Sequence, residues 1–124
     1  MQQEETMFGE FGGGSADRLK VLHCLRAPVG GLFRHVCDLA RAQCEAGYEV
    51  GVVCSDEPND ATTLDKLSRL ETFCTLGVKR VPLGRFPGVS DIRALRATKS
   101  IVQDLQPDIV HGHGAKGGLL SRLV

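Results

Sequence analysis

The chain has 124 residues and a mass of 13.4 kDa, which is the size of one ordinary domain with its own core and too small for a two-domain enzyme. Its 15 basic and 15 acidic residues balance, so no excess charge attracts a polyanion and a nucleic-acid partner is not expected.

The cysteines and residues 1–18 give information about the cellular location of the protein. The five cysteines include no CxxC pair and lie mostly among apolar residues, which predicts reduced core thiols in a cytoplasmic protein. No apolar run approaches the roughly 20 residues that a membrane-spanning helix needs. Residues 1–18 are rich in glycine and acidic side chains and lack the features of a secretory signal. They predict a flexible tail before a single domain at residues 19–124.

From residue 19 onward, strand and helix patterns alternate. A short apolar run at residues 20–25 predicts a strand buried on both faces. The three- and four-residue spacing of apolar side chains from Phe33 to Cys44 predicts an amphipathic helix, which Gly47 ends in the left-handed conformation. Residues 48–54 predict a second strand.

The middle of the chain predicts a helix, a strand and a loop. Leucines at helical spacing in residues 61–77 indicate a short helix that ends near Gly77. Residues 78–83 predict a third strand, although Pro82 limits its pairing. The glycines and proline of residues 84–88 are typical of a loop.

The last part of the chain predicts a helix, a strand and a further helix. Ser90 and Asp91 can cap a helix that Pro107 prevents from continuing. Residues 108–111 predict a fourth strand, and a helix that opens at Gly114 is interrupted by the end of the chain. The expected inner face of the helix before the proline consists of Ile92, Leu95, Ile101 or Val102, and Leu105.

Alternating strands and helices form βαβ units, so the fold class is α/β, a doubly wound parallel sheet of the Rossmann-like kind. In the common strand order 3-2-1-4, the first and fourth strands are neighbours at the topological switch point. Ligands enter such sheets beyond the carboxyl ends of these strands. The segments that follow these two strands are therefore the candidate site.

The segment after the first strand contains Arg26, Gly30 and Gly31. Paired glycines at the start of a helix bring bare N–H groups close to a ligand, for which an anion is the natural choice; an unliganded tight turn is the alternative. Arg26 can bind substrate charge or stand in water at the sheet edge. Because the glycines do not form GxGxxG, they argue against a nicotinamide cofactor.

The segment after the fourth strand contains His111, His113, Gly114 and Lys116. Strand alternation places the two histidines on one side of the sheet. A lysine in the first turn of a helix opposes the helix dipole, so Lys116 indicates either an anion such as phosphate or a solvated side chain. The order of glycine and lysine does not match a P-loop.

A metal site is not expected, because the His-x-His pair has no third ligand at a suggestive spacing. Two other histidines carry less information. His23 lies inside the first strand and is expected to be a packed core residue, and His35 is expected to be partly exposed.

The ordered segments resemble the N-terminal domain of family 4 glycosyltransferases. The resemblance runs from about residue 19 to the last residue, and its final segment is the most specific. The segments are KVLH at residues 20–23, VGGLFRHV at 29–36, GYEV at 47–50 and PDIVHGHGAKGGL at 107–119.

This resemblance implies a GT-B enzyme that transfers sugar from a UDP- or GDP-sugar, with retention of configuration and without a metal or other cofactor. It implies that Gly30 and Gly31 approach the donor diphosphate and that His113, or alternatively His111, approaches the transferred sugar. The implied acceptor is a glycan or a lipid-linked sugar, in bacterial surface polysaccharide or lipid-linked sugar assembly. The implied location is cytoplasmic, with peripheral association at the inner face of the membrane as a further option.

In this family a C-terminal domain supplies most donor contacts, so we interpret the chain as the N-terminal portion, truncated in the helix after the fourth strand and inactive alone. The alternative is a non-catalytic Rossmann-like module that binds a nucleotide or a partner protein.

Overall fold

The computed structural model describes residues 18–84 and 88–124, in which strands and helices alternate as expected. The expected tail lies outside these residues except for Arg18, as do positions 85–87 of the expected loop. The elements are β1 (Lys20–Cys24), α2 (Gly30–Glu45), β2 (Glu49–Ser55), α3 (Ala61–Glu71), β3 (Gly77–Val81), α4 (Val89–Leu105), β4 (Ile109–Gly112) and α5 (Gly114–Leu123).

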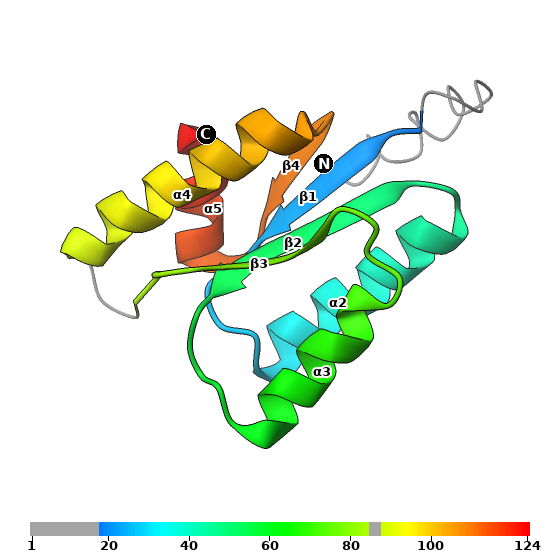
Figure 1. Ribbon diagram of the computed structural model, residues 1–124, viewed down its shortest axis with the longest axis horizontal. Coiled ribbons are helices and arrows are strands. Elements are labelled where there is room, and N and C mark those ends of the chain that lie inside the picture. Colours follow the sequence, from blue (N-terminus) through cyan, green and yellow to red (C-terminus); the bar gives the residue numbers. More distant parts are fainter. Residues whose placement is uncertain (1–17, 85–87) are drawn as a thin grey trace.

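The strands form one parallel four-stranded sheet in the order β3-β2-β1-β4. Helices α2 and α3 lie on one face of the sheet, and α4 and α5 lie on the other (Figure 1). This arrangement confirms the doubly wound Rossmann-like fold and its strand order. Parallel strands are joined by crossover helices, and these helices bury both faces of the sheet.

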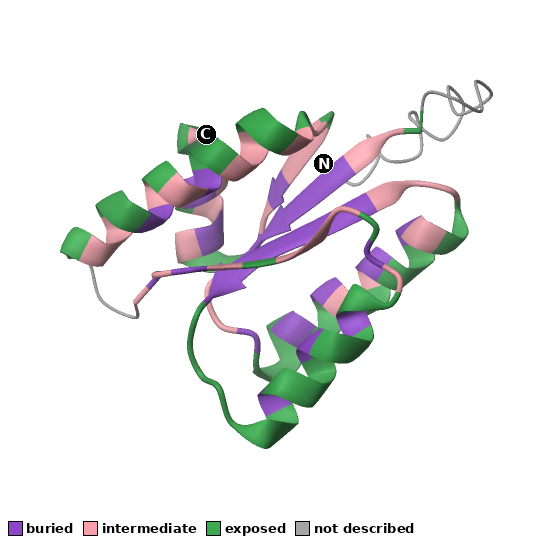
Figure 2. Cartoon of the chain, viewed as in Figure 1, coloured by how far each residue is buried: buried purple, intermediate pink, exposed green. Residues whose placement is uncertain are grey.

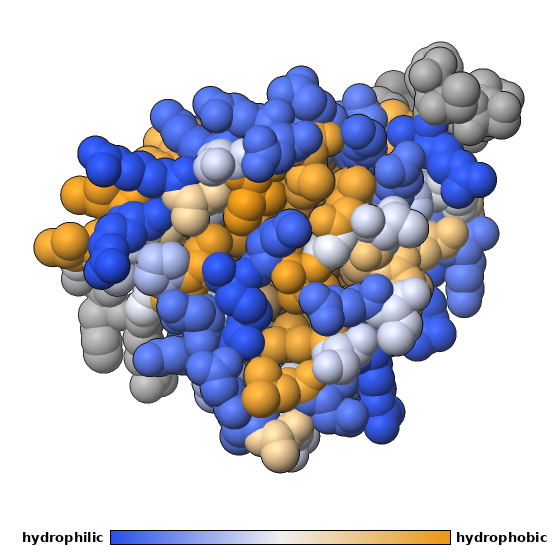
Figure 3. All heavy atoms as spheres, viewed as in Figure 1, coloured by the Kyte–Doolittle hydropathy of each residue, from blue (hydrophilic) through white to orange (hydrophobic). Residues whose placement is uncertain are grey.

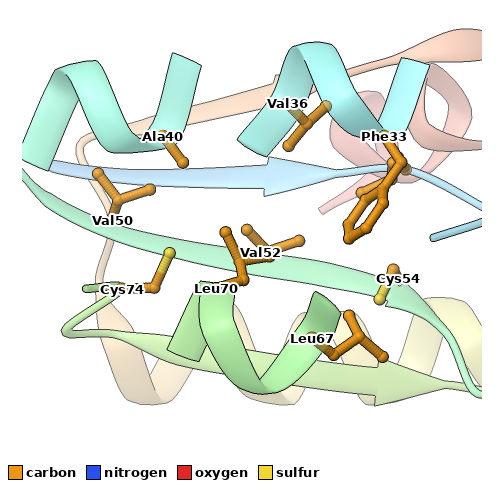
Figure 4. Close-up of a cluster of buried hydrophobic side chains, with 10 residues drawn as sticks. Phe33, Val36, Ala40, Val50, Val52, Cys54, Leu67, Leu70 and Cys74 are labelled. Atoms are coloured by element: carbon orange, nitrogen blue, oxygen red, sulfur yellow. The ribbon is translucent and has the colours of Figure 1, made fainter. Parts of the chain in front are cut away.

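β1 and β2 are the most deeply buried strands (Figure 2), and a separate core lies on each face of the sheet. Successive side chains of a strand point to opposite faces, so β2 sends Val50, Val52 and Cys54 to one core and Val53 to the other. In the first core these residues meet the inner faces of α2 and α3 (Figure 4). That core also contains Leu25, Phe33, Val36, Ala40, Leu67, Leu70 and Cys74.

The ends of the first two helices follow local sequence signals. Gly47 has a φ of 99°, which confirms the left-handed position after α2. Asp60 caps α3, because its carboxylate accepts a hydrogen bond from the Thr63 backbone N–H at 3.2 Å. The cap is an acidic side chain at the positive end of the helix, where its charge is favourable.

The expected start of α4 is wrong in detail. The helix begins at Val89 with Gly88 as its N-cap, so Asp91 lies in the first turn and its carboxylate binds Lys116 instead of capping the helix. Ile92, expected on the inner face, is 58% exposed because the buried side of the helix is centred on Ala94 and Thr98. The other expected inner residues, Leu95, Ile101, Val102 and Leu105, do pack against the second core.

The outer faces of the helices are largely hydrophilic, and hydrophobic side chains gather between the two helix layers in this view (Figure 3). Within the described residues, no helix combines the length and the apolar character required to cross a membrane.

Helix α5 crosses the sheet at unusually close range. A Cβ added to Gly117 would collide with the Cys24 carbonyl of β1, and one added to Gly112 would lie 2.5 Å from the Gly117 carbonyl oxygen. Gly118, the next residue of the helix, faces open space. Glycine at positions 112 and 117 is therefore required by packing, which holds the start of α5 against the ends of β1 and β4.

We predict that Gly117→Ala lowers the free energy of unfolding by roughly 2 kcal/mol, because the added methyl group overpacks the contact between α5 and β1. Gly118→Ala is the matched control and should raise stability by about 0.5–1 kcal/mol, since alanine favours the helix and meets nothing. Urea denaturation of both variants checks this. Equal effects of the two substitutions would contradict the close packing.

Candidate functional site

The candidate site lies where β1 and β4 end side by side. The parallel register sets His23 opposite His111 and Cys24 opposite Gly112. Beyond the strands, the His113 backbone N–H donates to the Cys24 carbonyl at 2.8 Å, which continues the pairing into the N-cap position of α5. The backbone thus fixes the histidines of both strands at one edge of the sheet.

Three imidazole rings form a buried cluster at this edge. The rings of His111 and His113 stack with centroids 4.0 Å apart, which confirms that strand alternation sends both to one side. The His23 ring lies 5.4 Å from that of His111 and 5.1 Å from that of His113. None of the three is more than 7% exposed, so the cluster belongs to the interior of the domain.

A chain of hydrogen bonds links this cluster to α2. His23 Nδ1 lies 2.9 Å from His113 Nε2, and His23 Nε2 lies 2.8 Å from the Oε1 atom of Gln43. Gln43 is only 5% exposed, because it continues the inner face of α2 after Val36 and Ala40. His23 is thus buried, as expected, but its partners are polar.

Burial controls the protonation of these rings. The pKa of His23 falls from 6.5 to about 4, mainly through loss of solvent and with a smaller contribution from nearby His111 and His35, although the hydrogen bond with Gln43 acts in the opposite direction. The pKa of His113 also falls to about 4, first through burial and then through its histidine neighbours. Both rings are therefore neutral near pH 7 and act there as hydrogen-bonding groups, not as cations.

The tertiary structure supplies a third candidate metal ligand that sequence spacing did not reveal. Each of His23, His111 and His113 offers one nitrogen, and these atoms lie within 4.8 Å of one another. However, His23 Nδ1 is already in a hydrogen bond with His113 Nε2, and the rings of His111 and His113 are stacked with an interplanar angle of 28°. A metal would have to replace this hydrogen bond and turn the rings. The geometry is that of a hydrogen-bonded cluster.

The glycine turn after β1 meets the histidine segment. Gly30 has a φ of 80°, and a Cβ on Gly30 or Gly31 would meet nothing within 4 Å, so packing does not explain why Gly31 lacks a side chain. Gly114 has a φ of 75°, and a Cβ there would lie 3.3 Å from Leu32 of α2. Arg26 is half-buried beside this turn, and its carbonyl accepts the Ser55 N–H at 2.7 Å. The structure therefore brings the two expected loops together.

Lys116 has a protein partner. Its ammonium lies 2.5 Å from the Asp91 carboxylate of α4, and both side chains are largely buried. The expectation that this charge in the first turn of α5 needs an anion is met within the chain, and a phosphate would have to share Lys116 with Asp91.

Three features of the site were not found from sequence. Gln43 could have been noticed as a polar residue in the apolar stripe of α2. His35 is exposed, yet its ring lies edge-on to that of His113 with centroids 6.1 Å apart.

The third feature is a groove between α2 and α3, which depends on how these helices pack. It has a volume of about 440 Å³ and runs from Gly30 and Gly31 along both helices. Apolar residues that include Phe33, Leu70 and Phe73 line it together with one carboxylate, Asp38, and four cations, Arg34, Arg41, Lys66 and Arg69.

We predict that the domain loses stability as the pH falls from about 6.5 to about 4. The unfolded chain binds protons at His23 and His113 in this range and the folded chain does not, so the free energy of unfolding should drop by about 1.4 kcal/mol per pH unit for each histidine. Denaturant titrations at several pH values check this. His35→Ala, which removes an exposed ring, should keep the slope; a flat profile between pH 6.5 and 5 would contradict buried neutral histidines.

The chain matches the model of a known protein family. The family model described as Glycosyltransferase Family 4 matches residues 29–124, which is more than half of the chain and includes the glycine turn and the histidine segment. No curated protein and no solved structure matches the chain. The Rossmann-like fold is consistent with this match, and the chain belongs to glycosyltransferase family 4.

Proposed function

We propose that this domain is the acceptor-side half of a GT-B enzyme that transfers a sugar from a UDP- or GDP-sugar to a glycan or lipid-linked acceptor, with retention of configuration. The observation that carries the proposal is the meeting of two uncapped helix starts and a neutral histidine cluster at one sheet edge. A second domain is proposed to supply the remaining donor contacts. The proposed location is cytoplasmic, with peripheral association at the inner face of the membrane.

The two helix starts suit the donor diphosphate. Neither α2 nor α5 has a side chain that caps it or an acidic residue in its first turn, whereas Asp60 caps α3. Their first N–H groups therefore remain open to an external anion. Bare backbone at Gly30, Gly31 and Gly114 allows phosphate oxygens to come close, and Arg26 stands beside the turn. This set of donors supports phosphate binding without a metal ion.

The histidine cluster suits the transferred sugar. A neutral imidazole can hydrogen-bond to a sugar hydroxyl without repelling the positive charge that develops on the sugar ring during transfer. We assign this contact to His113, which lies in the segment that reaches α5, and give His111, which lies within β4, a mainly structural role.

The groove between α2 and α3 suits an acceptor that carries both negative charge and apolar surface. Its cations outnumber its single carboxylate, and the aromatic and leucine side chains provide an apolar lining. Arg41 lies over the Phe73 ring at 4.8 Å, and Arg69 pairs with Asp65 at 3.1 Å. Arg34 and Lys66 are exposed cations on the two sides of the groove. A phosphate-linked lipid acceptor satisfies both properties.

We predict that His113→Ala, in the enzyme that combines this domain with its donor domain, lowers kcat by about a hundredfold or more, as loss of one aligned electrostatic group does. His111→Ala should mainly lower stability. Steady-state kinetics and thermal melts separate these effects. If His113→Ala keeps a near-normal kcat while His111→Ala folds but is inactive, the sugar contact belongs to His111. If both variants are fully active, the site assignment is wrong.

We further predict that Arg34→Glu combined with Lys66→Glu raises the KM for a phosphate-linked acceptor by about tenfold or more, equivalent to about 1.4 kcal/mol, and leaves the donor KM unchanged. The effect should shrink at high salt because these side chains are exposed. Lys99→Glu, a charge reversal on the exposed surface of α4, is the control. An unchanged acceptor KM would place the acceptor elsewhere.

A further inference from the structure

We propose that Gln43 and His23 are positioning residues that hold the His113 ring as the Nε2–H tautomer, so that Nδ1 of His113 carries a lone pair and can only accept a hydrogen bond from a ligand. The assignment of that ligand as the transferred sugar rests on the proposed function. The tautomer itself depends only on contacts within this chain.

The first step is the contact between Gln43 and His23. An amide oxygen can only accept a hydrogen bond, so the 2.8 Å contact between Gln43 Oε1 and His23 Nε2 requires the proton to be on His23 Nε2. Both side chains are almost fully buried, so water does not compete for this bond. The α2 helix therefore selects the tautomer of a histidine in the central strand.

The second step is the contact between His23 and His113. Because His23 is neutral near pH 7 and carries its one proton on Nε2, its Nδ1 atom can only accept. His113 Nε2 lies 2.9 Å away, and it must be the donor in this pair. The contact with Gln43 thus determines, through His23, which nitrogen of His113 carries the proton.

The third step concerns the remaining nitrogen of His113. With its single proton on Nε2, the neutral ring has a lone pair on Nδ1. A phosphate oxygen or a carboxylate, which offers only lone pairs, would be repelled there, whereas a hydroxyl can donate its proton to Nδ1. Nδ1 of His113 therefore accepts a hydrogen bond from a hydroxyl group of the ligand. The diphosphate would instead be bound by the N–H groups at the starts of α2 and α5.

The opposite arrangement is chemically well defined. If the Gln43 amide group were reversed, its NH₂ would donate to His23 Nε2, His23 would carry its proton on Nδ1, and His113 would become the Nδ1–H tautomer. His113 would then offer a donor to its ligand, and phosphate would be accepted. The tautomer of His113 therefore decides between the two ligand classes.

The test is long-range ¹H–¹⁵N NMR of the ¹⁵N-labelled 124-residue chain at pH 7, which identifies the protonated nitrogen of each ring. Protons on Nε2 of both His23 and His113 are expected. An Nδ1–H tautomer at His113 would overturn the proposal.

A variant tests the role of the glutamine. Gln43→Met has similar length but no amide oxygen, so it should abolish the single Nε2–H tautomer of His113. His35→Ala, which removes a neighbouring ring outside the hydrogen-bond chain, should leave the His113 signals in the Nε2–H pattern. If the His113 tautomer is unchanged in folded Gln43→Met, Gln43 does not position it. If that variant does not fold, the wild-type spectrum still decides the tautomer.

These results are independent of the proposed function. An Nε2–H tautomer at His113 together with normal turnover by His113→Ala would uphold the positioning and reject the catalytic assignment. In the active enzyme, Gln43→Met should lower kcat while leaving the KM for the nucleotide-sugar donor within about twofold, since the diphosphate contacts are untouched.

Discussion

The pairing of β1 with β4 is the interaction on which both the sheet and the candidate site depend. β1 lies at the centre of the fold, with β2 on one side and β4 on the other. Its register with β4 places His23 opposite His111 and directs the His113 backbone N–H to Cys24. A slip of one residue would turn the β4 side chains to the other face and separate the imidazoles. Gly112 and Gly117 have no side chain, so α5 can lie directly on the ends of β1 and β4 without disturbing this register.

A polar cluster inside such a sheet must satisfy its own hydrogen bonds. An unpaired polar group in the interior costs about 1–3 kcal/mol. His23 avoids this cost by bonding to Gln43 on one side and His113 on the other, whereas the Nε2 atom of Gln43 is buried with no hydrogen-bond partner among the described residues. Burial also keeps both histidines uncharged near neutral pH. In the proposed function, backbone N–H groups at this edge would bind anions, and the neutral imidazoles would bind hydroxyl groups.

Helix α2 connects the parts of this arrangement. Its inner face supplies core residues and Gln43, and the glycine turn lies at its start. The helix also lines one side of the groove between α2 and α3. Because α2 is one rigid element, the distances between the turn, the cluster and the groove are set together. A substitution that tilts α2 is expected to disturb all three.

The sequence by itself determined the fold class, the strand order and the two loops that meet. Apolar periodicity and the glycines and prolines at element ends are local signals, and they were sufficient to predict the strands and helices to within a few residues, except that α3 ends at Glu71 and not near Gly77. The side of the sheet taken by His111 and His113 also followed from strand alternation. The family assignment, first expected from ordered motifs such as the one at residues 107–119, was confirmed by the family model.

Only the tertiary structure decided the partners of the polar side chains. Nothing local indicates that Gln43 reaches His23, that Lys116 reaches Asp91, or that His23 completes a three-histidine cluster. These contacts join residues far apart in the chain, and they exist because helices of particular length and tilt pack on a sheet of particular register. The groove between α2 and α3 likewise depends on how two helices pack. Local patterns specify which face of an element is buried, whereas the pairing of buried polar groups is a property of the whole fold.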